Sequence, residues 1–169
     1  SDKPLEALHL LYTGIQNNVS NSLVLMADRL GFSLTLATPE PAENQESFDA
    51  DLQAMITNNP SIMLVADPRD AIVAADFIYT DTWIDMQYFN DPTKHAEKTA
   101  LVAQMQRFQI NADLIAGHEL KIMHDMPIHN DYEITEAAVR DPRSIIFDQA
   151  ANRLHAQKGL LYWLLVANT

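Results

Sequence analysis

The chain has 169 residues, 47% of them apolar and 20% charged, a balance typical of one folded domain rather than a disordered segment. Its formal net charge of −12 argues against nucleic acid or an anionic membrane surface as a partner, and it suits a small-molecule ligand. The sequence has no cysteine and no apolar run longer than residues 159–167, which excludes disulfides, cysteine–zinc sites and a membrane-spanning helix and favours a cytoplasmic protein.

Two kinds of segment alternate along the chain. Short apolar runs are predicted to be strands, and the third of them, which is continuously apolar, is expected to be buried. The predicted strands are residues 8–12, 33–37, 61–66, 77–80, 121–124 and 144–147. Segments with apolar residues at three- and four-residue steps are predicted to be helices. The predicted helices are residues 17–30, 48–57, 68–75, 96–108, 111–116, 133–139 and 149–166.

The first predicted helix has clear signals at both ends. Asn17 or Asn18 is a suitable N-cap, and Gly31 ends the helix. Strands that alternate with helices predict an α/β domain over residues 1–169. We expect an open parallel sheet of about five strands with helices on both faces, which is a Rossmann-like three-layer domain.

Polar side chains follow three of the predicted strands. Asn17 and Asn18 follow the first strand, Asp81 follows the fourth, and His124 and Asp125 lie at the end of the fifth. Because the carboxyl ends of parallel strands share one edge of the sheet, we expect these side chains to converge on one crevice. Amide groups and a helix N-terminus can bind a carboxylate, and carboxylates can bind an ammonium group. A zwitterionic amino acid would suit this crevice.

Structural roles also account for some of these residues. One asparagine is expected to cap the helix whatever the function, Asp81 can simply end a strand, and His124 can be a buried core histidine. A metal site built from His124, Asp125 and His129 is a further alternative, although nothing in the sequence determines its geometry. The sequence lacks a P-loop, a GxGxxG fingerprint and a nucleophile elbow, which counts against a nucleotide-binding dehydrogenase.

Four segments carry the most specific motifs. They are NNVSNSL at residues 17–23, DFIYTDTW at 76–83, FQIN at 108–111 and SIIFDQAANRLHAQK at 144–158. In order and in spacing, these segments resemble the second half of the ornithine carbamoyltransferases, which belong to the aspartate/ornithine transcarbamylase superfamily. The similarity extends over nearly the whole chain.

The resemblance implies an enzyme with two domains. In that family the first domain binds carbamoyl phosphate through an STRT-type motif, and the second binds an amino-acid acceptor whose amine attacks the carbamoyl carbon and releases phosphate. Because no STRT motif occurs here, residues 1–169 are expected to be the acceptor-binding domain, with the N-terminal carbamoyl-phosphate domain absent. The resemblance further implies a homotrimer at full length, an amino-acid or diamine acceptor, no cofactor, no metal and a role in arginine metabolism.

The same resemblance assigns roles to particular residues. The positions matching Asn17 or Asn18 hold the carboxylate side of the acceptor, and the position matching Asp81 binds its α-ammonium group. Arg153 matches the arginine that contacts the carbonyl of carbamoyl phosphate. The acceptor-binding "SMG" loop of the family corresponds to Asp85, Met86 and the residue after them.

The segment from His124 to Pro127 matches the "HCLP" loop of the family. The backbone carbonyl at Met126 is expected to orient the carbamoyl group and the attacking amine, and the Met126–Pro127 bond is expected to be cis. Asp125 replaces the family cysteine and adds a negative charge where an anionic substrate binds. Two unit charges about 4 Å apart repel by roughly 4 kcal/mol at an intermediate effective dielectric. With a raised pKa, Asp125 can instead receive a proton from the attacking amine.

Two functions are consistent with these observations. The first is an ornithine-type carbamoyltransferase domain, which transfers a carbamoyl group to an ornithine-like amine and gives a ureido product. The alternative is a non-catalytic amino-acid-binding or assembly module that keeps the transcarbamylase fold. Two further departures from the family are Asp85, which replaces the serine of the "SMG" loop, and Ala151, which replaces a glutamate. The carboxylate of Asp85 is expected to alter recognition of the acceptor.

Overall fold

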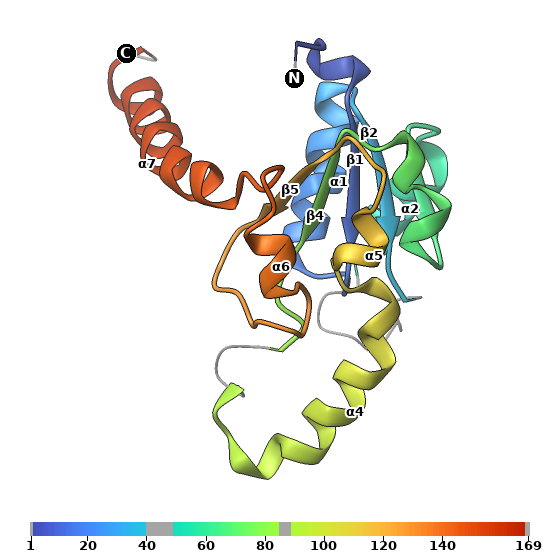
Figure 1. Ribbon diagram of the computed structural model, residues 1–169. Helices are drawn as coiled ribbons and strands as arrows, with labels where there is room; N and C mark the ends of the chain where they lie inside the picture. The colour runs from blue at the N-terminus through green and yellow to red at the C-terminus, as the bar shows by residue number, and fades with distance from the viewer. Residues whose placement is uncertain (1, 40–48, 85–88, 168–169) are drawn as a thin grey trace.

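The computed structural model describes residues 2–39, 49–84 and 89–167. This part of the chain forms one open sheet of five parallel strands in the order β3-β2-β1-β4-β5 (Figure 1). The strands are β1 (His9–Thr13), β2 (Ser33–Ala37), β3 (Ile62–Val65), β4 (Phe77–Thr80) and β5 (Lys121–His124). The predicted α/β class and parallel five-stranded sheet are therefore confirmed.

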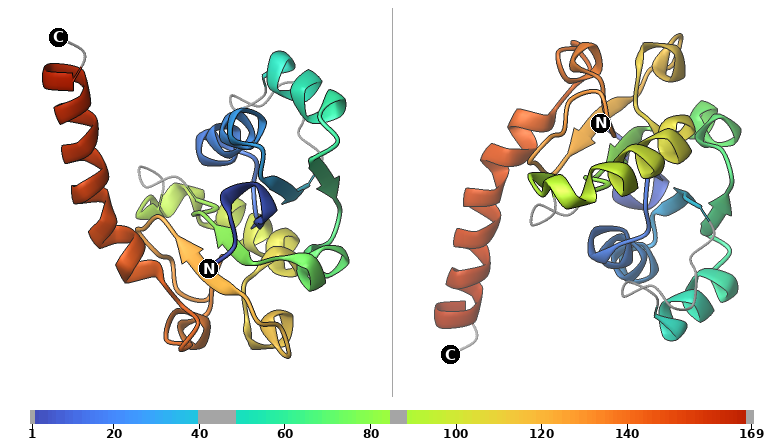
Figure 2. Two further views of the ribbon diagram at one scale, coloured as in Figure 1. Left: turned by 90° about the horizontal axis from the view of Figure 1, so that it is seen from above. Right: turned by 90° about the horizontal axis from the view of Figure 1, so that it is seen from below.

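Helices cover both faces of this sheet (Figure 2). Successive side chains of a strand point to opposite faces, so that Leu11 and Ile78 join one apolar cluster while Tyr12 and Tyr79 join the other. Helices α1 (Asn18–Leu30) and α2 (Ala50–Asn58) pack on the Tyr12 side. The Leu11 side is covered by η3 (Ile72–Ala74), which follows η2 (Pro68–Asp70), and by η5 (Gln106–Phe108), α5 (Ala112–Ile115) and α6 (Glu136–Val139). The three-layer prediction holds.

Helix α1 begins and ends where the sequence predicts. The Asn17 side chain accepts hydrogen bonds from the backbone N–H groups of Val19 and Ser20, and the Ser20 hydroxyl accepts from the N–H of Asn17. This reciprocal arrangement is a capping box. At the other end, Gly31 has a left-handed backbone (φ 77°) and donates to the carbonyl of Ala27. The cap holds the side chain of Asn17 at the N-terminus of α1, next to the end of β1.

The prediction that residues 61–66 form a buried strand is wrong about the burial. β3 lies at the edge of the sheet, and the side chains of Met63 and Leu64 are exposed. A continuous apolar run is typical of a strand covered on both faces, but an edge position leaves part of its surface open.

The predicted strand at 144–147 is also wrong. Ser144 makes one isolated bridge to Ile122 of β5, and the chain enters α7 (Ile146–Tyr162) directly afterwards. The N–H of Ser144 donates to the carbonyl of Asp141, so residues 141–144 form a turn next to the sheet.

Two predicted helices are shorter than the sequence pattern indicates. The predicted helix at 133–139 starts only at Glu136, because Thr135 is its N-cap and Ile134 forms a bridge to Ile110. The predicted helix at 68–75 consists of two short 3-10 turns.

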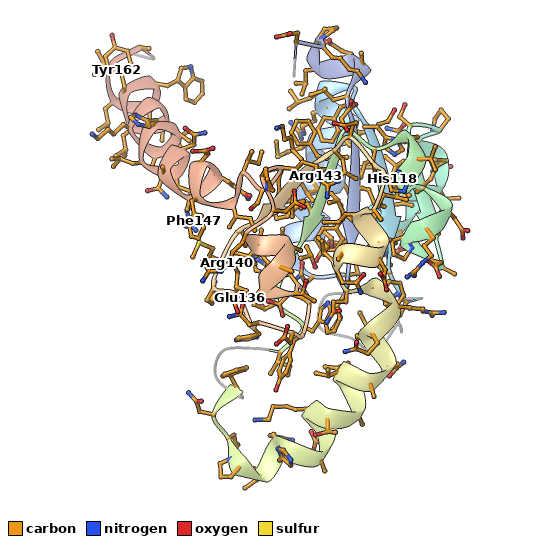
Figure 3. The ribbon with its side chains drawn as sticks, in the orientation of Figure 1. His118, Glu136, Arg140, Arg143, Phe147 and Tyr162 are labelled. Carbon is orange, nitrogen blue, oxygen red and sulfur yellow. The ribbon has the colours of Figure 1, made fainter. Side chains whose placement is uncertain are left out.

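Two helices extend beyond the layers. These helices are α4 and α7. α4 (His95–Met105) follows η4 (Pro92–Lys94) and is buried only at its last residue, Met105. A further short turn, η1 (Leu5–Ala7), precedes β1. α7 contacts β5 at its start and then leaves the sheet, ending in the π-helical turn η6 (Trp163–Ala167). Its labelled side chains Phe147 and Tyr162 point away from the sheet (Figure 3).

Helix α7 and the turn η6 after it present apolar side chains to solvent. The exposed large apolar residues of α7 are Phe147, Leu154, Leu160, Leu161 and Tyr162, and those of η6 are Trp163, Leu164, Leu165 and Val166. None of the helices in the described part of the chain is long and apolar enough to cross a membrane. Large contiguous apolar surfaces mark interaction sites in proteins, so this helix is suited to packing against another protein surface.

Candidate functional site

The polar ends of β1, β4 and β5 meet at one edge of the sheet. These strands are neighbours, and the register pairs Tyr12 with Tyr79 and Thr80 with His124. The chain passes outward from β1 to β2 and β3, then returns to the other side of β1 as β4 and β5. The order of the strands therefore reverses between β1 and β4. In open α/β sheets, ligands bind in the crevice outside such a switch point.

Asn17 and Asp81 flank this switch point and are hydrogen-bonded to each other. The Asn17 Nδ2 donates to Asp81 Oδ2 over 2.7 Å, while the second carboxylate oxygen, Asp81 Oδ1, accepts from the N–H of Thr82 over 2.7 Å. Asn17 is half-buried, whereas Asn18 is the exposed first residue of α1. The structure thus assigns the cap to Asn17 and leaves Asn18 facing solvent at the helix N-terminus.

Substitution of Asn17 separates its two contacts. We expect Asn17→Ala to lower the free energy of unfolding by about 1 to 2 kcal/mol, because the first turn of α1 loses its cap. Asn17→Ser should restore most of this stability, since a serine hydroxyl caps well, but it lacks the amide donor to Asp81. Urea unfolding of the three proteins measures the effect. Equal instability of both variants would show that the Asp81 contact, and not the cap, carries the stability.

Asp125 follows β5 and faces Asp81. Its side chain is 28% exposed, and its Oδ1 is buried without a hydrogen-bond partner among the residues that the structure describes. Burial, together with the neighbouring Asp81 carboxylate, raises the pKa of Asp125 to about 6. Two carboxyl groups from adjacent strand ends therefore lie together, and they favour a shared proton or a bound cationic group between them.

The loop after β5 has an unusual backbone. Met126 has a positive φ of 60°, and the bond from Met126 to Pro127 is cis, as the family resemblance implied. The N–H of Met126 donates to Nδ1 of His124 over 2.9 Å, and the N–H of His124 donates to the side chain of Gln149 over 3.0 Å. His124, at the end of β5, is thus hydrogen-bonded both to the loop that follows it and to helix α7.

Arg153 lies on the exposed side of α7, beyond Gln149. Burial raises the pKa of the Tyr79 hydroxyl, and the Asp125 carboxylate adds to this. Arg153 acts on Tyr79 in the opposite direction, so its guanidinium lies within electrostatic range of the β4 end. Asp85 and Met86, the predicted acceptor loop, lie outside the described residues.

The alternative of a metal site at His124, Asp125 and His129 has no support in the geometry. Both ring nitrogens of His124 are engaged, Nδ1 by the N–H of Met126 and Nε2 by Glu133. Within residues 2–39, 49–84 and 89–167, no group of three or more histidine, aspartate or glutamate side chains lies close enough to hold a metal ion.

Two residues of this region are not predicted from the sequence to belong to the site. The helical pattern predicts Gln149 as the start of a helix and Glu133 as a helical residue, whereas in the structure both side chains contact His124. Glu133 lies within nine residues of two histidines, His124 and His129, and this proximity is the one sequence feature that points to a contact between them. The sequence does not show that the Glu133 side chain points into the protein.

Fold and site together define the class: an α/β domain with polar residues gathered at the switch point of a parallel sheet, which is where such folds bind their ligands. The sequence model of the family described as "Aspartate/ornithine carbamoyltransferase, Asp/Orn binding domain" matches residues 6–164. The chain belongs to this family, and the resemblance noted in the sequence is confirmed.

Individual relatives give the same result. The ornithine carbamoyltransferase of Nitrobacter winogradskyi is 37% identical over 167 residues, which cover 97% of this chain and 51% of the relative. That of Methanococcus maripaludis is 37% identical over 166 residues, covering 96% and 53%. The crystal structure of ornithine carbamoyltransferase from Thermus thermophilus matches with a TM-score of 0.73 at 32% identity, covering 94% of this chain and 48% of that one. The chain spans about half the length of the relatives it matches.

Proposed function

We propose that this chain is the acceptor-binding domain of an ornithine carbamoyltransferase. The reaction transfers the carbamoyl group of carbamoyl phosphate to the side-chain amine of an ornithine-like acceptor and gives a ureido product and phosphate. The observation that carries the proposal is the Asn17–Asp81 pair at the switch point beside the His124–Pro127 loop, in a chain of this family. The comparisons favour this function over a non-catalytic module.

The acceptor would lie across the ends of β1, β4 and β5. Asp81 takes the α-ammonium group, and Asn17, Asn18 and the N-terminus of α1 take the α-carboxylate. Asp85 and Met86 contribute the acceptor loop. The side-chain amine then points toward the carbonyl of Met126, where the carbamoyl group is held.

Catalysis on this scheme comes from orientation and from electrostatic stabilisation of the tetrahedral transition state. Arg153 contacts the carbamoyl carbonyl, and the carboxylate of Asp125 accepts the proton that the amine loses. No cofactor is needed, because attack, proton transfer and loss of phosphate are all carried out by these groups and the two substrates.

A carbamoyl-phosphate domain would complete the site. The proposal therefore includes a longer, two-domain protein that is a cytoplasmic homotrimer of arginine metabolism. Two observations support the second domain: relatives are about twice as long as the matched region, and the apolar surface of α7 is uncovered in the described structure.

The test is an activity assay on the protein encoded by the complete reading frame, or on this chain mixed with the carbamoyl-phosphate domain of a relative. Carbamoyl phosphate is supplied with ornithine, lysine, putrescine or N-acetylornithine, and the ureido product is measured. We expect product with one acceptor well above the others. Absence of product with every acceptor, from a folded sample that still binds one of them by calorimetry, would instead establish the non-catalytic module.

A further inference from the structure

Glu133 is a buried carboxylate that the proposed reaction does not use. Its side chain is 0% exposed, as is that of His124, with which it pairs. Its Oε1 accepts hydrogen bonds from Nε2 of His124 over 3.2 Å and from the backbone N–H of His129 over 2.6 Å. Burying a carboxylate is costly unless hydrogen bonds compensate, so a residue in this position needs a physical reason.

The hydrogen bonds of His124 define which ring nitrogen carries the proton. Nδ1 accepts from the N–H of Met126 over 2.9 Å, so Nδ1 bears no hydrogen. In a neutral imidazole the hydrogen is then on Nε2, where it is donated to Glu133. Protonation of Nδ1 would place two N–H groups face to face and remove the contact with Met126.

Glu133 thereby holds both ends of the loop between positions 124 and 129. One end is held through the ring of His124 and the other through the backbone of His129, whose ring stacks on Phe89 at 3.9 Å between centroids. Between these points lies Met126, with its left-handed backbone. A residue with a side chain adopts this conformation only where its surroundings impose it. Here the bond to His124 Nδ1 does so.

We propose that Glu133 is a positioning residue for the reaction: it fixes the Nε2–H tautomer of His124, and this tautomer places the Met126 carbonyl. The inference rests on the proposed function, in which that carbonyl orients the carbamoyl group. Glu133 acts through His124 and does not contact either substrate. Loss of its acceptor frees the ring to change tautomer, and the loop then loses the bond that defines the backbone at Met126.

The tautomer is measured directly by NMR of the ¹⁵N-labelled protein. We expect a pyridine-like shift at Nδ1 of His124 and a pyrrole-like shift at Nε2. Glu133→Gln keeps a carbonyl oxygen that accepts from Nε2 and from His129, so this tautomer should persist. Glu133→Leu removes the acceptor and should give a mixture of tautomers. A protonated Nδ1 in the unsubstituted protein overturns the proposal without any variant.

Kinetics on the complete enzyme provide the second measurement. Glu133→Leu should lower kcat by about 10²-fold, which is the effect of a misplaced reacting group, with KM for the acceptor little changed. Glu133→Gln should recover most of the lost kcat. Glu136→Gln is the matched control, because Glu136 is exposed on α6 and pairs only with Arg140 among the described residues (Figure 3).

The outcomes are distinguishable from a failure of the proposed function. If the unsubstituted enzyme forms no ureido product, the function fails, while the tautomer is still decided by NMR. If the enzyme is active and folded Glu133→Leu keeps its kcat, the positioning role is wrong. It is also wrong if Glu133→Gln loses as much kcat as Glu133→Leu while the Nε2–H tautomer persists.

Discussion

Asp81→Asn is expected to lower kcat/KM for an α-amino acid acceptor by roughly 30- to 1,000-fold, or about 2 to 4 kcal/mol. The substitution removes the negative charge that would pair with the α-ammonium group. It also turns the 2.7 Å bond from Asn17 Nδ2 into a contact between two amides. Asp81 lies at the switch point between β1 and β4, and the nearby carboxylate of Asp125 is reserved in the proposed reaction for proton transfer.

The acceptor itself supplies a sharper measurement. Ornithine and 5-aminopentanoate differ only in the α-ammonium group, so their ratio of kcat/KM reports the contact with Asp81. We expect a strong preference for ornithine in the unsubstituted enzyme and a ratio near unity in Asp81→Asn. Asp28→Asn is the control, because Asp28 is an exposed carboxylate on α1 bonded to Asn59. An unchanged ratio in Asp81→Asn would assign the α-ammonium group to another residue.

Asp125→Asn is expected to lower kcat by about 10²-fold or more, because the amide cannot accept the proton that the attacking amine loses. Burial and the Asp81 carboxylate raise the pKa of Asp125 to about 6, so the proton-accepting form increases as the pH passes this value. The activity of the unsubstituted enzyme should therefore rise through about pH 6. In Asp125→Asn this inflection should disappear. If the same inflection remains in the variant, another group titrates and Asp125 is not the proton acceptor.

The raised pKa of Asp125 also makes its effect on the stability of the fold depend on pH. The folded protein prefers the protonated form of Asp125, so ionisation destabilises the fold as the pH rises from about 4 to about 6. Below this range both the folded and unfolded chains are protonated, and Asp125→Asn should have little effect. At about pH 7.5 the variant should be the more stable protein by roughly 1 to 3 kcal/mol. Urea unfolding at the two pH values measures the difference, and equal differences at both would contradict it.

The carboxylate at position 125 also bears on substrate choice. The sequence predicts that this carboxylate repels an anionic substrate, and in the structure it neighbours the second carboxylate, that of Asp81. A neutral, protonated Asp125 reduces this repulsion, whereas its ionised form favours a cationic amine. Measuring KM for carbamoyl phosphate on either side of about pH 6 separates these effects, because only the ionised form should weaken carbamoyl phosphate binding.

Much of the local structure was predictable from short-range patterns. The strands β2, β4 and β5 begin and end at the predicted residues, and α1 lies between Asn17 and Gly31 as its caps indicate. These features depend on neighbours in sequence, such as a side chain that bonds to a backbone group three residues away. The cis bond before Pro127 came from the family resemblance, not from residue patterns.

Errors arose where the outcome depends on the whole fold. The apolar run at β3 does not reveal that the strand lies at an edge, and the apolar residues 144–147 meet the sheet only at Ser144 before α7 begins. A segment with strand propensity forms a strand only when it can pair with a neighbouring strand. Here residues 141–144 form a turn, closed by the hydrogen bond from the N–H of Ser144 to the carbonyl of Asp141, so that only Ser144 pairs with β5.

The sequence by itself determined the class of fold and the family, because helix period, caps and motif spacing are properties of short segments. Only the tertiary structure decided which groups are neighbours. The strand order places Asn17 beside Asp81, and the approach of β5 to β4 brings Asp125 close to Asp81. Packing turns Glu133 inward onto His124. These relations come from contacts between residues far apart in the chain or from burial, and no local pattern records either.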